Sequence, residues 1–267
     1  MRYWLVMPAA GAGRRFGGRH IGGRHSGERV PPKQYATLKG RTVIEWALTP
    51  FLTDRRCAGA VIALAPGDAW WPKVAERIAA VTVAPGGAQR SESVRNALAA
   101  LNRRANKEDW VLVHDAARPC LSSADLNLLI ERVCEHAVGG ILAQPVADTL
   151  KRSVSSGPLP TSTPGAVGAA GADSVQPGTV PAIDTTIDRS ALWRAGTPQM
   201  FRYGALCDAL DRAIAAGRHP TDESQALEWV GEHPLLVEGS AANIKVTTAD
   251  DLALAESLLA GREGKSS

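Results

Sequence analysis

Residues 3–15 read YWLVMPAAGAGRR, a short apolar run that leads directly into a turn with two glycines and two arginines. An apolar run without a polar interruption is typical of a strand buried in a parallel sheet. Glycine allows the backbone to approach a ligand closely, and the cations of Arg14, Arg15 and, further along, Lys33 match phosphate oxygens. The stretch therefore predicts a parallel α/β sheet whose first strand ends at a polyphosphate site.

Positive charge is concentrated around this turn. Residues 1–41 hold nine lysines and arginines and one acid, Glu28, so this segment carries +8, and because the whole chain carries +3, the remainder carries −5. Such a cluster raises the local concentration of anionic ligands. A nucleic-acid-binding protein can carry one too, but here no aromatic residues are interleaved with it and no nucleic-acid motif accompanies it. We expect a small anionic ligand and no nucleic-acid partner.

Length and composition are those of a soluble globular protein. The chain has 267 residues, of which 45% are hydrophobic and 21% charged, enough for one large domain or two small ones. Its four cysteines, at positions 57, 120, 134 and 207, have no CxxC or metal-type spacing, which indicates reduced core thiols. The N-terminal apolar run is too short for a signal peptide or a membrane-spanning helix. We expect a cytoplasmic protein without a membrane partner.

Strand-like and helix-like patterns alternate along the first half of the chain. Strands are expected at residues 3–7, 60–65, 81–84, 111–114 and 140–143, and helices at residues 42–51, 71–80, 91–101 and 122–136. This alternation predicts a three-layer α/β sandwich with right-handed crossovers, in which ligands bind at the carboxyl ends of the strands. The segments that follow strands, and that should meet there, are 8–15, 85–93 and 114–119.

The second half has a similar pattern after two interruptions. Helices are expected at residues 203–216, 223–230 and 248–259, the last with Thr248 as its N-cap, and short strands at 235–238 and 244–246. Residues 16–31 contain the sequence GGRH twice and indicate a mobile basic loop. Residues 153–183 are rich in proline, glycine, serine and alanine, with Asp173 as their one charged residue. Such a composition cannot form a core and predicts a flexible insert.

A second glycine turn, PGGAQRSES, occupies residues 85–93. It either forms a plain strand-to-helix connection with Ser91 as N-cap, or brings Gly87 and Ser93 to a base or ribose. The first turn is neither a dinucleotide fingerprint, because its third glycine is missing, nor a Walker A motif, because no Gly-Lys-Ser/Thr follows. A dinucleotide-dependent dehydrogenase is therefore disfavoured.

A third segment, HDAARP at residues 114–119, follows an apolar strand. It places Asp115 three residues before Arg118, which is compatible with a structural ion pair. An aspartate at the carboxyl end of a strand is also a suitable ligand for a metal or a sugar hydroxyl. Both interpretations stay open at this point.

Together, the motifs resemble those of the 2-C-methyl-D-erythritol 4-phosphate cytidylyltransferase family. The matching stretches occur in order and read PAAGAGRR at 8–15, PKQY at 32–35, GGAQRSESV at 86–94, VHDAARP at 113–119, TDESQA at 221–226 and VEGSAANIKVT at 237–247. The resemblance implies a Rossmann-like sandwich of the nucleotide-diphospho-sugar transferase type, with a mostly parallel mixed sheet and an extended β-arm. It further implies a homodimer, with one nucleotidyltransferase domain over residues 1–267 and a dimerisation arm at about 145–191 that contains the insert 153–183.

The resemblance also implies an activity, transfer of CMP from CTP to a methylerythritol phosphate, and site residues. Mg²⁺ is expected as the cofactor, held mainly by the CTP phosphates. The implied catalytic residues are Arg15, Lys33, Lys245 and, from the arm of the partner subunit, Arg189. The implied nucleotide contacts are Ala9, Ala10, Gly11, Gly86, Gly87, Ser93 and Asp115, the last being also the candidate metal ligand. The implied contacts to the acceptor are Arg118, Thr149, Thr197 and Thr221.

The sequence departs from the family pattern in three places. Ala88 stands where the family commonly has an aspartate, the loop 16–31 is longer than usual, and the insert 153–183 enlarges the arm. The entropic cost of closing a loop rises only slowly with its length, so such an insert is compatible with an intact dimer. Two alternatives stay open: a cytidylyltransferase for ribitol 5-phosphate, which shares most of these motifs, and a phosphate- or RNA-binding module without turnover.

Overall fold

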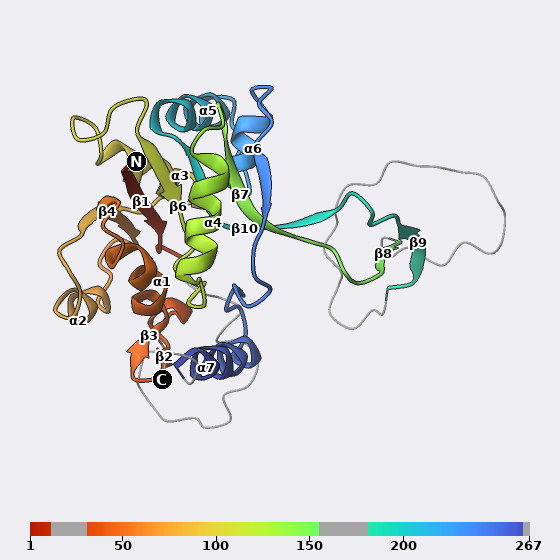
Figure 1. Cartoon of the computed structure of the whole chain (residues 1–267), viewed down its shortest axis with the longest axis horizontal. Coiled ribbons are helices and arrows are strands. Elements are labelled where there is room, and N and C mark those ends of the chain that lie inside the picture. The colour runs from red at the N-terminus through yellow and green to blue at the C-terminus, as the bar shows by residue number, and fades with distance from the viewer. Residues whose placement is uncertain (12–30, 155–180, 264–267) are drawn as a thin grey trace. The chain divides into compact units, whose positions relative to one another are not determined.

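A computed structural model describes residues 1–11, 31–154 and 181–263 (Figure 1). The chain divides into two compact units, one formed by residues 1–144 together with 195–267 and the other by residues 145–194. Most of the expected basic loop 16–31 and of the insert 153–183 lies outside the described residues, and so does Arg15. Within the described parts of the chain, no helix is long and apolar enough to cross a membrane.

A mixed seven-stranded sheet forms the centre of the first unit. Its strand order is β11 (Leu235–Glu238), β7 (Gly139–Pro145), β10 (Trp193–Arg202), β6 (Trp110–Val113), β1 (Tyr3–Pro8), β4 (Cys57–Leu64) and β5 (Thr82–Pro85). Parallel pairs join β6 to β1, β1 to β4, β4 to β5 and β7 to β11, while β10 runs antiparallel to β6. The predicted α/β fold with a mostly parallel mixed sheet is confirmed, with β1 between two parallel neighbours.

Helices connect these strands, and their ends follow local capping chemistry. The described helices are α1 (Val43–Leu52), α2 (Trp71–Ala75), α3 (Arg90–Ala99), α4 (Ser123–Val133), α5 (Tyr203–Ala215), α6 (Glu223–Glu228) and α7 (Ala249–Glu263), and shorter elements are η1 (Lys33–Tyr35), β2 (Thr37–Leu38) and β3 (Arg41–Thr42). At α3, Glu92 accepts a hydrogen bond from the backbone N–H of Gln89 at 3.2 Å, so the cap lies before Ser91. At α7, Thr248 accepts from the N–H of Asp251 at 3.2 Å, and its predicted capping role is confirmed.

The sheet is covered on both faces, which makes three layers. Along β1, Tyr3, Leu5 and Met7 pack in one hydrophobic cluster with residues of α1 and α4. Val6 points the other way and packs with residues of α3 and α5. This alternation follows from the two-residue period of a strand. A third, smaller cluster joins α7 to the short strand β2.

The sequence fails to predict β10, although this strand lies inside the sheet, between β7 and β6. Its sequence, WRAGTPQMFR, has no apolar run, because the polar residues Thr197 and Gln199 interrupt it. In the fold both are nevertheless buried, 3% and 1% exposed. The strand expected at residues 244–246 is wrong. That segment has no strand pairing, and the N–H of Val246 donates instead to the backbone oxygen of Ala117 at 2.8 Å. Tertiary contacts decide the structure at both places.

In the second unit, two short strands pair. β8 (Leu150–Ser153) and β9 (Ile183–Ile187) run antiparallel on either side of the insert. Lys151 donates to the hydroxyl of Thr186 across the pair at 2.6 Å. The expected dimerisation arm includes these strands, and its role stays a prediction.

The close contact between β7 and β10 generates a stability prediction. Gly139 begins β7 with φ +131°, and a Cβ there would lie 2.3 Å from the backbone oxygen of Met200. We expect Gly139→Ala to lower the free energy of unfolding by about 2–4 kcal/mol, from backbone strain and overpacking together. Urea denaturation measures this loss.

Gly261 provides the control with the opposite sign. It lies in α7, and a Cβ added there would have no atom within 4 Å, so Gly261→Ala should stabilise the protein by up to about 1 kcal/mol. Equal effects of the two substitutions would contradict the packing described for Gly139.

Candidate active site

Segments that follow β1, β5 and β6 border one cavity of about 670 Å³ in the first unit. The carboxyl ends of neighbouring parallel strands lie at one edge of the sheet, so their convergence here is expected. The predicted site residues in its lining are Ala9, Ala10, Gly11, Lys33, Gly87, Ser93, Asp115 and Lys245. The structure therefore brings these eight predicted residues to one cavity, and their roles stay predictions.

Two glycines allow the turn after β5 to pack closely, Gly86 against the turn after β1 and Gly87 against the start of α3. A Cβ on Gly86 would lie 2.2 Å from the Cβ of Ala10, so the lack of a side chain at Gly86 allows this turn to pack against Ala10 of the cavity wall. A Cβ on Gly87 would lie 2.3 Å from that of Glu92, and the N–H of Gly87 donates to the hydroxyl of Ser93 at 3.0 Å. A side chain on Gly86 would push the two turns apart, and one on Gly87 would clash with Glu92 at the start of α3. Ser93 thus holds the turn as well as lining the cavity.

Lys33 lies on the short helix η1, and the next residue ties this helix to the first glycine turn. Gln34 is 4% exposed, and its Nε2 donates to the backbone oxygens of Ala9 at 2.9 Å and Gly11 at 3.2 Å. The two hydrogen bonds fix the position of Lys33 relative to the turn. Gln34 is a site residue that the sequence reasoning missed, although it stands within the PKQY motif.

Asp115 lies two residues after the end of β6, among three cations. Its Oδ1 accepts from Nε and Nη2 of Arg90, both at 3.1 Å. Its Oδ2 lies 2.8 Å from Nζ of Lys245 and 3.6 Å from Nε of Arg118. Burial alone would raise the pKa of Asp115, but these three cations hold it well below its usual value. The ion pair with Arg118 that the sequence suggested is therefore one part of a larger charge cluster.

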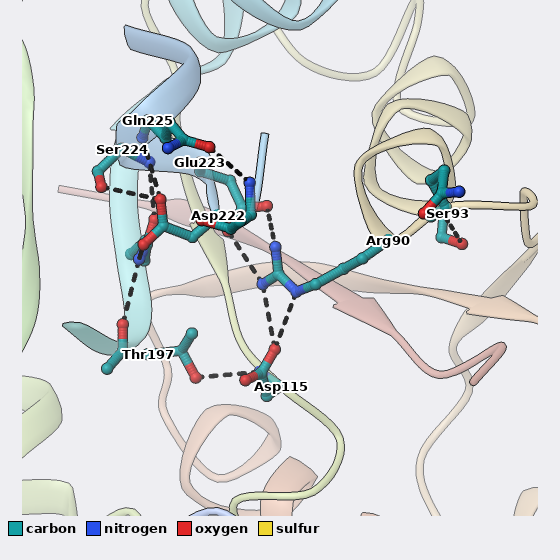
Figure 2. A network of polar contacts seen from close by, with 12 residues as sticks. Arg90, Ser93, Asp115, Thr197, Asp222, Glu223, Ser224 and Gln225 are labelled. Atoms are coloured by element: carbon teal, nitrogen blue, oxygen red, sulfur yellow. Dashed lines mark hydrogen bonds and ion pairs between the residues drawn. The ribbon is translucent and has the colours of Figure 1, made fainter. Parts of the chain in front are cut away.

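Arg90 connects this cluster to a second carboxylate, Glu223, at the start of α6 (Figure 2). Its Nη1 donates to Oε1 of Glu223 at 2.6 Å, and its Nη2 donates to Oε2 at 3.1 Å. Burial raises the pKa of Glu223 and the charge of Arg90 lowers it, with a net rise. Neither residue is recognisable as a site residue from the sequence, because 133 positions separate them and only the fold brings them together.

A smaller cavity of about 140 Å³ shares residues with the first. The residues that line both cavities are Arg90, Asp115 and Lys245. The predicted site residues Arg118, Thr197 and Thr221 line the smaller one. A row of charged side chains therefore separates two adjoining pockets.

The Thr197 hydroxyl forms hydrogen bonds within the protein. Its Oγ1 accepts from the backbone N–H of Asp115 at 3.1 Å and lies 3.0 Å from Nδ1 of His114. Nε2 of His114 lies 3.2 Å from the backbone oxygen of Arg118. A carbonyl oxygen can only accept, so the ring proton is on Nε2 and Thr197 donates to Nδ1. Burial lowers the pKa of His114 to about 4, which keeps the ring neutral at pH 7.

Three predicted site residues are not part of the described first unit. Arg15 lies outside the described residues. Thr149 and Arg189 belong to the second unit, next to β8 and β9, and their roles stay predictions.

Among the residues with described positions, no group of three or more His, Cys, Asp or Glu could hold a metal ion. Each Asp115 oxygen already has a cationic partner, so this donor set suits a metal held chiefly by oxygens of a bound ligand.

Known proteins are similar to this chain over nearly its whole length. The sequence profile of the 2-C-methyl-D-erythritol 4-phosphate cytidylyltransferase family matches residues 3–164 and 159–261. A relative of that name from Halorhodospira halophila is 45% identical over 97% of this chain and 94% of its own length. Another of that name, from Ectopseudomonas mendocina, is 43% identical over 94% of this chain and 93% of its own.

Solved structures agree with these relatives. The crystal structure of a 4-diphosphocytidyl-2C-methyl-D-erythritol synthase matches with a TM-score of 0.73 and 37% identity, covering 97% of this chain and 100% of that one. The 2-C-methyl-D-erythritol 4-phosphate cytidylyltransferase of Francisella tularensis matches with a TM-score of 0.68 and 30% identity, with the same coverage. With two adjoining pockets at the carboxyl edge of its sheet and sequence similarity along nearly its full length, this chain belongs to the 2-C-methyl-D-erythritol 4-phosphate cytidylyltransferase family.

Proposed function

We propose that this protein transfers CMP from CTP to 2-C-methyl-D-erythritol 4-phosphate in isoprenoid precursor biosynthesis, yielding 4-diphosphocytidyl-2-C-methyl-D-erythritol and pyrophosphate. The observation that carries the proposal is the pair of cavities that share Arg90, Asp115 and Lys245. A transfer between two anionic substrates needs adjoining pockets with cations at their junction. The larger cavity, with its glycine turns, would take CTP, and the smaller one the acceptor.

In this reaction the phosphate of the acceptor is the nucleophile. One of its oxygens attacks the α-phosphorus of CTP in line, and the bond from that phosphorus to the bridging oxygen of pyrophosphate breaks, with pyrophosphate taking the electron pair. A phosphate monoester is largely ionised near neutral pH, so no general base is needed. The protein has to hold two anions together and stabilise the charge on the reacting phosphates. Lys33 lines the larger cavity and Lys245 lines both, which supports a role for these two cations in stabilising that charge.

We also propose Mg²⁺ as the cofactor. It would enter with CTP and be held by the triphosphate oxygens, because both oxygens of Asp115 have cationic partners. When bound, Mg²⁺ neutralises phosphate charge and polarises the phosphoryl group. This makes Asp115 an organiser of protein cations rather than a direct metal ligand.

The proposed enzyme is a cytoplasmic homodimer. An isolated two-stranded ribbon is only marginally stable, and the second unit exposes large apolar side chains, Ile183 at 66% and Trp193 at 37%. A partner subunit that covers them would account for both features. Thr149 and Arg189 would then reach the acceptor pocket of the partner. None of the four cysteines forms a disulfide, which supports a reducing compartment.

The acceptor can be tested directly with purified protein, CTP and Mg²⁺. We expect pyrophosphate release with 2-C-methyl-D-erythritol 4-phosphate at a kcat/KM far above that with ribitol 5-phosphate. Turnover of ribitol 5-phosphate alone would overturn the proposed acceptor. Binding to RNA with a steep salt dependence, and no turnover of either acceptor, would support a binding module instead.

Lys33→Ala should abolish most turnover. Removing one donor to a developing charge costs about 100- to 1,000-fold in kcat, while a partly exposed cation adds little to stability. Steady-state kinetics and a thermal melt on the same sample separate the two effects. Lys73→Ala, at an exposed position on α2, is the matched control and should behave as the wild type. Normal turnover in Lys33→Ala would remove Lys33 from the mechanism.

Shared sites can be tested by mixing two inactive variants, Arg189→Ala and Lys245→Ala. Half of randomly re-formed dimers are mixed, and each mixed dimer has one site with both residues, so activity should recover to about a quarter of wild type. The measurement is pyrophosphate release after unfolding and refolding the two variants together. Mixed dimers that form but stay inactive would argue against exchanged arms.

A further inference from the structure

Glu223 lines neither cavity, yet one residue connects it to both. Its side chain is 1% exposed, and both carboxylate oxygens accept hydrogen bonds from Arg90, at 2.6 and 3.1 Å. Arg90 in turn lines both the larger and the smaller cavity. Burying a carboxylate and a guanidinium is costly, and such a pair often adds nothing to stability compared with apolar residues. The position of this pair, directly behind the junction of the two pockets, is better explained by a role in the site.

The fold anchors Glu223 from both sides (Figure 2). Gln199 of β10 donates from Nε2 to Oδ2 of Asp222 at 3.1 Å, and its Oε1 accepts from the backbone N–H of Ser224 at 2.9 Å. Asp222 also caps α6 by accepting from the N–H of Gln225 at 3.0 Å. Both neighbours of Glu223 are therefore fixed to the central sheet or to the helix. Because its backbone is anchored on both sides, the Glu223 carboxylate can hold the guanidinium of Arg90 in place.

Through Arg90, Glu223 affects which cation contacts each oxygen of the Asp115 carboxylate. Arg90 directs Nε and Nη2 to Oδ1 of Asp115, and turns Nη1 toward Glu223. Its four hydrogen bonds to two carboxylates use most of the five N–H donors of a guanidinium. Oδ2 of Asp115 is left facing Nζ of Lys245 at 2.8 Å. Lys245 is 42% exposed at its side chain, whereas Arg90 is 26% exposed.

We propose that Glu223 is a positioning residue of the transfer reaction, which neutralises and holds Arg90 so that Lys245, and not Arg90, is the cation that meets the reacting phosphates. The inference rests on the proposed function. Formally, Arg90, Arg118 and Lys245 carry three positive charges and Asp115 and Glu223 two negative ones, a net +1. Without the charge of Glu223 the cluster carries +2, and Asp115 alone pairs with the Arg90 guanidinium, which then attracts an anionic ligand more strongly.

Glu223→Gln tests this role, because it keeps the size of the side chain and removes its charge. We expect kcat to fall at least tenfold as the arrangement of Asp115 and Lys245 is lost. At the same time, CTP with Mg²⁺ should bind several-fold more tightly, and pyrophosphate should inhibit several-fold more strongly, since the pocket has gained positive charge. A merely structural role would lower the folded fraction and leave both affinities unchanged.

Two further variants complete the experiment. The double variant Arg90→Gln with Glu223→Gln removes both charges, so nucleotide affinity should return toward the wild-type value while kcat stays low. Asp211→Asn breaks a second carboxylate–arginine pair, in which Arg95 of α3 places Nη2 at 2.8 Å from Asp211 Oδ2. This pair is more exposed than that of Glu223, with Asp211 51% exposed at its side chain, and neither residue lines the two cavities. Asp211→Asn should leave kcat and affinity unchanged.

The outcomes separate this inference from the proposed function. A folded Glu223→Gln variant with wild-type kcat and wild-type CTP affinity would overturn the positioning role. A fall in kcat in proportion to the folded fraction, with unchanged affinity, would overturn it as well. If the wild type binds CTP but does not turn over methylerythritol phosphate, the proposed function fails, and the comparison of CTP affinities among the variants still decides the role of Glu223.

Discussion

One buried carboxylate among three cations organises the site of this protein. Asp115 joins Arg90 at the start of α3, Arg118 in its own loop and Lys245 in the segment after β11. An unpaired carboxylate at this depth would be strongly destabilising, so the folded state requires all of these segments to meet. The same contacts divide the crevice at the end of the sheet into two pockets. Stability and the geometry of the site therefore depend on the same atoms.

The cluster also explains how a site for two anions can be basic and still carry only a small net positive charge. A reaction between two phosphates needs fixed cations to offset their repulsion. Too many mobile cations would bind the substrates and the pyrophosphate product tightly without favouring the transition state. Here Asp115 and Glu223 neutralise part of the positive charge and fix the direction of the rest. The excess of positive charge in residues 1–41 supplies further cations, of which Lys33 lines the larger cavity.

Features set by local physics were predictable from the sequence. The apolar run of residues 3–7 is typical of a buried strand, and the glycines that follow it and β5 mark places where the backbone needs close approach. A Cβ on Gly86 or Gly87 would lie within 2.2 or 2.3 Å of a neighbouring carbon, so the identity of these residues carried structural information. Motif context then assigned Lys33, Asp115 and Lys245 to a common site. What was missed are residues whose roles come from distant partners: Gln34, Arg90, Glu223 and the strand β10.

The fold class, the family and the edge of the sheet at which the pockets form all follow from the sequence alone. These depend on periodicity, on turn chemistry and on short motifs, all of which are properties of neighbouring residues. Three other features arise only in the folded chain: β10 enters the sheet antiparallel, Thr197 hydrogen-bonds within the protein, and Arg90 is shared between Asp115 and Glu223. The physical reason is that a buried polar group takes its role from the partner that satisfies it, and that partner lies far away in the sequence.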